Sequence, residues 1–192
     1  MTGETTTGSD GVRQKRIIVG LCGGIACYKV ATVVSRLVQR GATVTCAMTE
    51  SAKNFVAPLT FESLSARPVY TTVWDHVDSR DPQHIRLARD ADLMLIAPAT
   101  MSMIARLAQG FADDPVSLIA SAIDPRKTPI LLAPSMNSVM LAQHSTQRNL
   151  NLLREAGFRI IEPGSGWQAC RTEGPGRLPE PEELLRAIEG AL

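Results

Sequence analysis

The stretch Ala97-Pro98-Ala99-Thr100 follows the apolar run Leu93-Met94-Leu95-Ile96. A short apolar run that stops at a proline predicts a buried strand of a parallel sheet. Residues 101–110 have the apolar spacing of a helix and end at Gly110. The sequence therefore predicts a strand, a tight turn and a helix, and in an open α/β sheet such a turn lies at the carboxyl edge, where ligands bind. An ordinary connecting loop is the alternative for these four residues alone.

Four other apolar runs have the length and composition of buried strands. They are residues 17–21, 43–48, 129–133 and 158–161. Helical spacing is found between them, at 25–40, 58–64, 85–90, 116–123, 146–156 and 181–188. Strands that alternate with helices across short connections predict a single-domain α/β fold with a doubly wound, Rossmann-like parallel sheet.

The composition limits the classes of function. The 192 residues are enough for one domain with a sizeable core, and the formal net charge of +1 gives no reason to expect nucleic acid as a partner. No apolar run approaches the ~18 residues that a membrane span needs, so no membrane is expected. Residues 1–15 lack the apolar segment of a secretory signal and are expected to form a disordered tail before one domain over 16–192.

The four cysteines favour a reduced, cytoplasmic protein without a metal site. Cys22 and Cys27 are close in sequence, but no second pair or histidine cluster completes a ligand set. The pair Asp113-Asp114 also lacks a partner carboxylate at a suitable spacing. We therefore expect these two acids to cap a helix and expect no metal.

Two turns at the predicted carboxyl edge have the residue types of a phosphate site. Gly23-Gly24 joins the first strand to a helix, where free backbone N–H groups and the positive end of the helix dipole face one point. Thr49 and Ser51 follow the second strand and bring small hydroxyls to the same edge. The glycines form neither a full G-x-G-x-x-G nor a Walker loop. A simple bend and helix capping are the alternatives for these residues.

Asn137 ends a second turn of the strand–proline–polar type, Pro134-Ser135-Met136-Asn137, after the strand at 129–133. An amide both donates and accepts hydrogen bonds, which suits recognition of an amide or a carboxylate. Capping of the next helix is an equally good interpretation of these residues alone.

Two more residues are candidates only by their place in the chain. His84 stands just before the helix that leads to the central strand, so it could reach the sheet edge, although a lone histidine is commonly structural. Cys170 lies inside the Gly- and Pro-rich segment 163–180, which is expected to be a long functional or mobile loop. A single loop cysteine by itself indicates no role.

Together these segments resemble the flavin-dependent cysteine decarboxylases over about residues 16–188. The motifs that carry the resemblance stand in one order: Gly20-Leu21-Cys22-Gly23-Gly24-Ile25-Ala26-Cys27-Tyr28-Lys29, Met48-Thr49-Glu50-Ser51-Ala52, His84-Ile85-Arg86-Leu87, Ala97-Pro98-Ala99-Thr100, Ala133-Pro134-Ser135-Met136-Asn137-Ser138-Val139-Met140, and Ala169-Cys170 with Gly174-Pro175-Gly176-Arg177-Leu178-Pro179-Glu180-Pro181. The last two are the most specific. The resemblance implies the flavoprotein version of the doubly wound fold.

The resemblance also implies FMN as the cofactor, bound between the subunits of a homotrimer or of a dodecamer built from trimers. The positions that correspond to the family's cofactor site are Gly23, Gly24, Ile25, Thr49, Ser51, Pro98, Ala99, Thr100 and Ser135. Among these, the two glycines with Thr49 and Ser51 would hold the phosphate end.

The chemistry that the resemblance implies begins with oxidation of a cysteine thiol to a thioaldehyde by the flavin. That group is an electron sink for loss of CO2, and hydride return by the reduced flavin then gives the saturated aminothiol. His84 matches the active-site histidine, and Cys170 matches the acid that protonates the intermediate in the final reduction. The substrate-binding positions are Asn137, Met136 and Ser102. The most similar family members act on 4'-phosphopantothenoylcysteine, giving 4'-phosphopantetheine in coenzyme A biosynthesis.

Three positions depart from the family pattern. Ser102 stands where many members have an asparagine that contacts the substrate carboxylate, Leu141 stands where an aromatic residue is common, and Arg171 replaces the usual glycine after the cysteine. Two alternatives stay open. One is a decarboxylase of a peptide's C-terminal cysteine, whose known forms generally lack the reducing cysteine. The other is a flavin-binding regulatory subunit with little activity, which Ser102 supports. In bacterial family members the decarboxylase is often fused to a ligase domain that makes its substrate.

Overall fold

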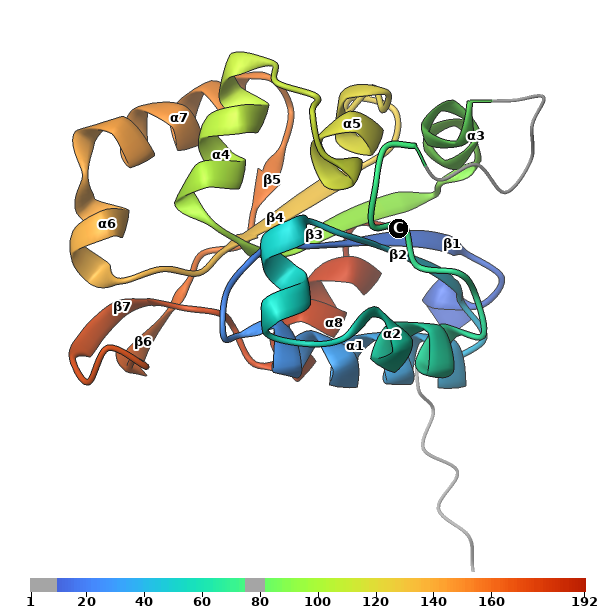
Figure 1. The fold of residues 1–192 in the computed structure, drawn as a ribbon, viewed down its shortest axis with the longest axis horizontal. Coiled ribbons are helices and arrows are strands. Elements are labelled where there is room, and N and C mark those ends of the chain that lie inside the picture. The colour runs from blue at the N-terminus through green and yellow to red at the C-terminus, as the bar shows by residue number, and fades with distance from the viewer. Residues whose placement is uncertain (1–9, 75–81) are drawn as a thin grey trace, which may run out of the picture.

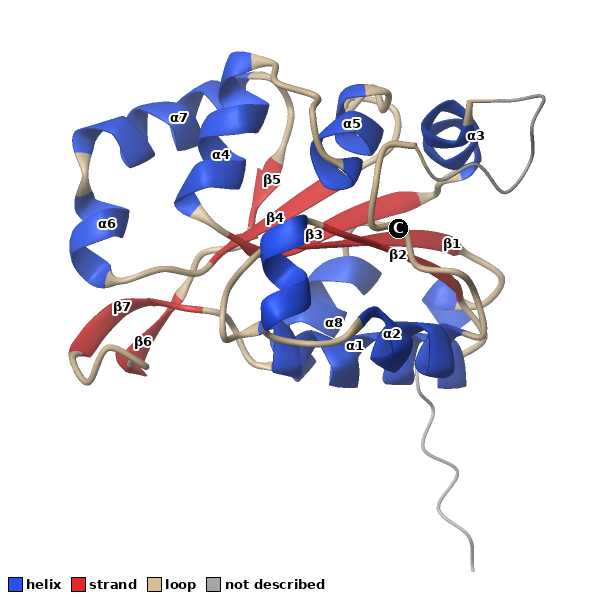
Figure 2. Ribbon diagram, in the orientation of Figure 1, coloured by secondary structure: helices blue, strands red, loops and turns tan. Residues whose placement is uncertain are grey.

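Five parallel strands form the central sheet of this computed structural model, which describes residues 10–74 and 82–192 (Figures 1 and 2). Their order in the sheet is β2-β1-β3-β4-β5. The strands are β1 (Arg16–Leu21), β2 (Thr43–Met48), β3 (Leu93–Ala99), β4 (Ile130–Pro134) and β5 (Arg159–Ile160). Because β1 lies between β2 and β3, the winding direction reverses there, so the predicted doubly wound sheet is confirmed and its switch point lies between β1 and β3.

Helices cover both faces of the sheet (Figure 1). One layer contains α1 (Cys27–Gln39), α2 (Pro58–Ser65) and α8 (Pro181–Glu189). The opposite layer contains α3 (Gln83–Asp90), α4 (Met101–Gln109), α5 (Pro115–Ser121) and α7 (His144–Glu155). Three short helices complete the described chain: η1 (Asp10–Val12), η2 (Glu50–Asn54) and α6 (Ser138–Ala142).

The strands are apolar runs because the helices bury them on both sides. Every residue of β3 is buried, and only Arg16 of β1 is exposed. Two apolar cores result, one on each face of the sheet. Gly20 of β1 permits the close approach of α5, since a Cβ atom at this position would lie 2.6 Å from Cγ1 of Val116. The sheet is thus a rigid base for whatever its carboxyl edge holds.

The strand β3 continues further than its sequence predicts. Pro98 was expected to end it, yet Ala97, Pro98 and Ala99 are buried inside the strand, with a cis peptide bond between Ala97 and Pro98. The pairing with β4 shifts register between Ile96 and Ala99, and this irregularity accommodates the proline. The connection to α4 is therefore a single residue.

Residues 10–15 belong to the folded unit, although their composition predicts part of a disordered tail. Val12 is fully buried in the core on the α1 face, and the backbone N–H of Gln14 donates to the carbonyl of Gly41 at 2.9 Å. One apolar residue among polar neighbours is too weak a pattern to predict this anchor. Residues 1–9, the rest of the expected tail, lie outside the described residues.

The segment expected to be a long loop forms a hairpin instead. Its strands are β6 (Gly164–Trp167) and β7 (Glu173–Arg177), which pair antiparallel. Glycines take φ values of 140° at Gly166 and 121° at Gly176, conformations that other residues rarely adopt. Such a strand contains few β-branched residues, so the usual strand signal is missing.

Candidate functional site

Four strand ends converge at the carboxyl edge of the sheet, and each is followed by a small residue. Gly23 follows β1, Thr49 follows β2, Thr100 follows β3 and Ser135 follows β4. These residues line one cleft of about 660 Å³, the size of a typical small-molecule site. We call it the hydroxyl cleft; its lining also includes the predicted residues Ser51, Ser102 and Met136.

The glycine turn after β1 is built for close approach. A Cβ atom at Gly23 would lie 2.4 Å from Cβ of Ser51, so only glycine lets the β1 turn meet the start of η2. The helix α1 that follows has no side-chain N-cap and no acidic residue in its first turn. The N–H groups of Cys27 and Lys29 already donate to the carbonyls of Gly24 and Ala26, so this helix offers an anion its positive dipole end and its remaining first-turn N–H groups.

Two hydroxyls that line the cleft also cap helices, so these residues fit both the capping and the ligand-binding interpretation. Thr49 accepts a hydrogen bond from the backbone N–H of Ala52 at 3.3 Å, and Thr100 accepts one from Met103 at 3.2 Å. Each hydroxyl keeps a proton to donate to a ligand. Capping fixes the position of both oxygens at the cleft wall.

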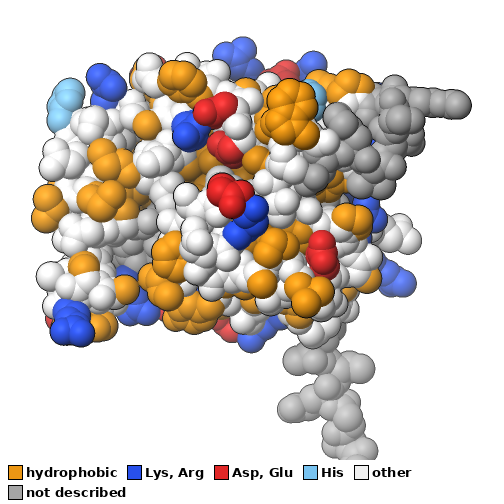
Figure 3. Space-filling view, viewed as in Figure 1, with side chains coloured by type: hydrophobic (Ala, Val, Ile, Leu, Met, Phe, Trp, Pro, Cys, Tyr) orange, Lys and Arg blue, Asp and Glu red, His pale blue; other side chains and the backbone are white. Residues whose placement is uncertain are grey.

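The charges at the cleft wall are paired with each other. Arg106 bonds to Asp113, and this hydrogen bond holds the pKa of the Asp113 carboxyl below its usual range and raises the pKa of the guanidinium. Asp114 caps α5 by accepting from Val116 N–H at 2.9 Å, which confirms the capping role expected for this residue. Acidic and basic side chains also lie next to each other across the centre of the face in Figure 3. A ligand phosphate would therefore be held by hydroxyls and backbone N–H groups rather than by a cluster of cations.

A second cleft of about 520 Å³ lies beside the first, between α1 and the hairpin. We call it the hairpin cleft; Gly24, Ile25, Asn137 and Cys170 are among its lining residues, together with the aromatic side chains of Tyr28 and Trp167. Ser135 and Met136 line both clefts, so the two are contiguous. Tyr28 is 60% exposed and Trp167 is 65% exposed.

Asn137 and Cys170 meet in the hairpin cleft although 33 residues separate them. The Nδ2 group of Asn137 donates to Sγ of Cys170 at 3.1 Å, and its Oδ1 accepts from Val139 N–H at 2.8 Å. The second bond caps α6, so Asn137 both caps a helix and faces the cysteine. The backbone of the hairpin is tied to the same turn, since Met136 N–H donates to the Gly176 carbonyl at 3.0 Å. A Cβ atom at Gly176 would lie 2.1 Å from that turn's Met136 oxygen, which explains the glycine.

The thiol of Cys170 differs from the other three thiols. Hydrogen bonds from Thr172 and then Asn137 lower the pKa of Cys170. Burial raises the pKa of Cys22, Cys27 and Cys46, the last to about 12. Cys170 is also the exposed member of the four free cysteines. It is therefore the one fitted for proton transfer at a surface cleft.

Arg171, next to this cysteine, has a φ of 64°. This left-handed conformation favours glycine, the residue that the family pattern has at this position. The arginine therefore takes the left-handed conformation of the turn at a cost in backbone strain.

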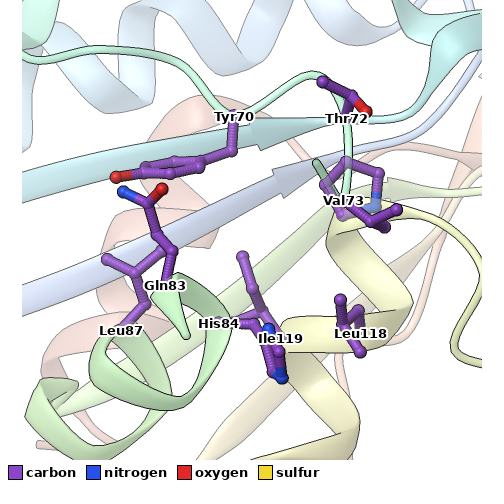
Figure 4. Close-up of a pocket in the computed structure, with 9 residues that line it drawn as sticks. Tyr70, Thr72, Val73, Gln83, His84, Leu87, Leu118 and Ile119 are labelled. Atoms are coloured by element: carbon purple, nitrogen blue, oxygen red, sulfur yellow. The ribbon is translucent and has the colours of Figure 1, made fainter. Parts of the chain in front are cut away.

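Three of the predicted site residues lie outside both clefts. His84, on α3, lines a separate pocket of about 20 Å³ with Gln83, Leu118 and Ile119 (Figure 4). Pro98 and Ala99 are buried in β3, where Ala99 accepts a backbone hydrogen bond from Ser135 N–H at 3.0 Å. Both residues therefore belong to the strand that positions the Thr100 turn, and they do not line the cleft.

The residues that sequence reasoning did not select come mainly from the hairpin. Trp167, Gln168 and Arg177 line the hairpin cleft, and Arg106 lines the hydroxyl cleft. The alternation of glycine in 164–166 and 174–176 is the one signal that could have indicated a hairpin there. Within residues 10–74 and 82–192, the structure has no group of three metal-ligating side chains and no helix long and apolar enough to span a membrane.

The chain belongs to the flavoprotein family, whose model matches residues 6–192. Over 175 residues it is 44% identical to the coenzyme A biosynthesis bifunctional protein CoaBC of Vibrio cholerae, a match that covers 91% of this chain and 43% of that protein. The corresponding Escherichia coli protein is 44% identical over 171 residues, covering 89% of this chain and 41% of its own length. The chain thus spans less than half the length of these relatives.

Solved structures give the same fold. A cysteine-to-serine mutant of PPC decarboxylase in complex with pantothenoylaminoethenethiol superposes with a TM-score of 0.82 at 27% identity, covering 92% of this chain and 97% of that one. The FMN-dependent cysteine decarboxylase SpaF gives 0.80 at 30% identity, with 94% and 96% covered. Both confirm the Rossmann-like flavoprotein architecture predicted from the alternation of strands and helices.

Proposed function

We propose that this chain is an FMN-dependent decarboxylase that converts 4'-phosphopantothenoylcysteine to 4'-phosphopantetheine. The contact between Asn137 and Cys170 beside the hydroxyl cleft is the observation that carries the proposal. It joins a group suited to bind the substrate and a group suited to donate a proton. The names of the relatives and of the PPC decarboxylase structure support the same reaction.

The hydroxyl cleft fits FMN. In this fold class a ligand binds at the β1/β3 switch point, where FMN lies in flavodoxin-like proteins. Gly23 and the hydroxyls of Thr49 and Ser51 line this cleft and would hold the phosphate. Gly24 and Ile25, in the turn before α1, would contribute from the adjoining wall of the hairpin cleft. When bound, the flavin supplies the two-electron oxidation of the substrate thiol and the returning hydride. Thr100 and Ser135 would hold the rest of the cofactor.

The substrate would occupy the hairpin cleft and reach into the hydroxyl cleft past Met136. The Nδ2 group of Asn137 would donate to the substrate carboxylate, and the hydroxyl of Ser102 would donate from the other side. Cys170 would hold the proton that the enethiolate receives in the reductive half of the cycle.

The same proposal includes a homo-oligomer, a trimer or an assembly of trimers. His84 lines neither cleft of its own chain, so a second copy would have to supply the histidine of each site. Two exposed apolar side chains lie on or near its helix: Trp74 is 80% exposed and Ile85 is 41% exposed. Apolar side chains in such positions favour burial against a partner. The free thiols suit the reducing cytoplasm, which we propose as the compartment.

The experiment that tests this function is mass spectrometry of the product after the purified, flavin-loaded protein has met 4'-phosphopantothenoylcysteine. We expect loss of CO2 alone from the wild type, no reaction with His84→Asn, and wild-type turnover with His144→Asn, a control at an exposed histidine on α7. Loss of CO2 plus two hydrogens from the wild type would indicate peptide-decarboxylase chemistry instead. Unchanged substrate with flavin bound would overturn the proposal in favour of a flavin-binding regulatory subunit.

A further inference from the structure

The turn of the β6–β7 hairpin contains a buried polar side chain whose orientation is fixed. Gln168 is 7% exposed, and its Nε2 group donates to the carbonyl of Pro175 at 2.8 Å. A carbonyl oxygen only accepts, so the amide nitrogen must face Pro175. The Oε1 atom of Gln168 therefore points to the other side, toward the turn, and can only accept hydrogen bonds there.

Two hydroxyl- or thiol-bearing side chains compete for that oxygen. Oγ1 of Thr172 lies 3.4 Å from Oε1 of Gln168, and Sγ of Cys170 lies 3.5 Å from it. The two competitors are 2.9 Å apart. Backbone bonds hold all three in place, because Gln168 N–H donates to the Thr172 carbonyl at 2.8 Å and Arg171 N–H donates to the Gln168 carbonyl at 2.9 Å.

The proton count of this cluster allows two arrangements. When Cys170 is a neutral thiol, its S–H donates to Oγ1 of Thr172, whose own O–H donates to Oε1 of Gln168. When Cys170 is a thiolate, the Thr172 hydroxyl turns and donates to sulfur, which already accepts from Nδ2 of Asn137. A rotation of one hydroxyl thus connects the two protonation states without moving the backbone.

We propose that Thr172, oriented by Gln168, is a positioning residue that sets the proton affinity of Cys170 during reduction of the intermediate. The inference rests on the proposed function in one respect: that function makes Cys170 the acid of the reductive step. In the step itself the S–H bond of Cys170 breaks, the proton goes to carbon, and the electron pair stays on sulfur. The hydride comes from the reduced flavin, and water later returns a proton to the thiolate.

The two cationic side chains that line the hairpin cleft pair with a carboxylate. Lys29 and Arg177 line the same cleft, and both pair with Glu180, at 2.6 Å and 3.1 Å. Arg171 and Glu173, of opposite sign, flank the turn on either side of Thr172. The hydroxyl of Thr172 is therefore the group whose removal should change the thiol most.

The test is the pH dependence of iodoacetamide alkylation at Cys170, followed by peptide mass spectrometry on the flavin-loaded protein. Thr172→Val keeps the shape but lacks the donor, so we expect alkylation at neutral pH to be roughly tenfold slower and its midpoint to move to higher pH. Thr172→Ser restores the donor and should return the wild-type profile. A Thr172→Val profile that superposes on that of the wild type would overturn the inference.

A second readout follows the product. If the proposed function holds, Thr172→Val should release a larger share of product that has lost CO2 plus two hydrogens, and Thr172→Ser should not. Unchanged partition together with a shifted alkylation profile would remove Thr172 from the reductive step. Because alkylation needs no turnover, a chain that fails to decarboxylate would refute the proposed function and leave the test of the thiol intact.

Discussion

At the scale of single residues, Gly23 and Gly24 look alike in sequence but meet different surroundings. A Cβ atom at Gly23 would clash with Ser51 at 2.4 Å, whereas one at Gly24 would make an ordinary contact of 3.7 Å with Pro98. We therefore expect Gly23→Ala to weaken FMN binding at least tenfold, a cost of about 1–3 kcal/mol of the kind that overpacking produces. Gly11→Ala is the control for binding, because Gly11 lines neither cleft and a Cβ atom there would meet nothing within 4 Å, so this variant should retain the affinity. Flavin fluorescence titration of the apoprotein measures both, and equal losses would contradict the steric argument.

The four cysteines differ in thiol pKa, and the lowered pKa of Cys170 makes its contribution to stability depend on pH. The thiolate of Cys170 is stabilised by its neighbours, so its pKa is lower in the folded chain than in the unfolded one. Its contribution to stability is thus present above the unfolded pKa and lost as the pH falls through the folded one. At neutral pH we expect iodoacetamide to add once to the native protein, at Cys170, and four times in denaturant. Adducts at Cys22 or Cys46 under native conditions would show that the core opens.

At the scale of elements, the two aspartates before α5 have different roles. Asp114 caps the helix, whereas Asp113 forms an exposed ion pair. Asp114 accepts from the N–H groups of Val116 and Ser117, at 2.9 Å and 3.1 Å, and forms a full capping box. Asp114→Ala should lower the free energy of unfolding by about 1 kcal/mol. Asp113→Ala removes only an exposed ion pair with Arg106 and should cost less. Urea denaturation measures both values, and equal losses would be inconsistent with capping.

Elements were predictable from the sequence where burial dictates composition. Strand β2 runs from Thr43 to Met48 as its apolar run indicates, and the turns after the strands place most of the predicted cofactor residues in one cleft. The hairpin lacked the usual strand signal, because its strands are rich in glycine and are held by contacts with the Met136 turn. Nor could the sequence show that Asn137 touches Cys170, since that contact depends on how the hairpin packs on the sheet edge.

At the scale of the whole molecule, one chain contains two separate parts of the proposed site. Cys170 and Asn137 line the hairpin cleft, whereas His84 lies on α3 in the layer above the sheet (Figures 1 and 4). The pocket that His84 lines shares no residue with either cleft, so these parts of the proposed site are separate within one chain. The histidine is thus either unnecessary for the reaction or provided by another copy.

A mixture of His84→Asn and Cys170→Ser chains distinguishes these possibilities, with formation of the saturated aminothiol as the readout. If the histidine is unnecessary, the His84→Asn chain forms that product by itself. Each His84→Asn chain keeps Cys170, and each Cys170→Ser chain keeps His84, so if the histidine is required neither variant alone has a complete site for the full cycle. In closed homo-oligomers formed by co-expression at equal amounts, random assembly gives about one quarter of the sites both wild-type residues if the histidine comes from a neighbour. We therefore expect about a quarter of the wild-type rate of saturated aminothiol formation, measured by mass spectrometry, in the mixed oligomers. A site contained in one chain would give none, since every chain then lacks one of the two groups. The same mixture made from separately folded oligomers that do not exchange subunits is the control, and it should stay inactive whichever chain supplies a required histidine.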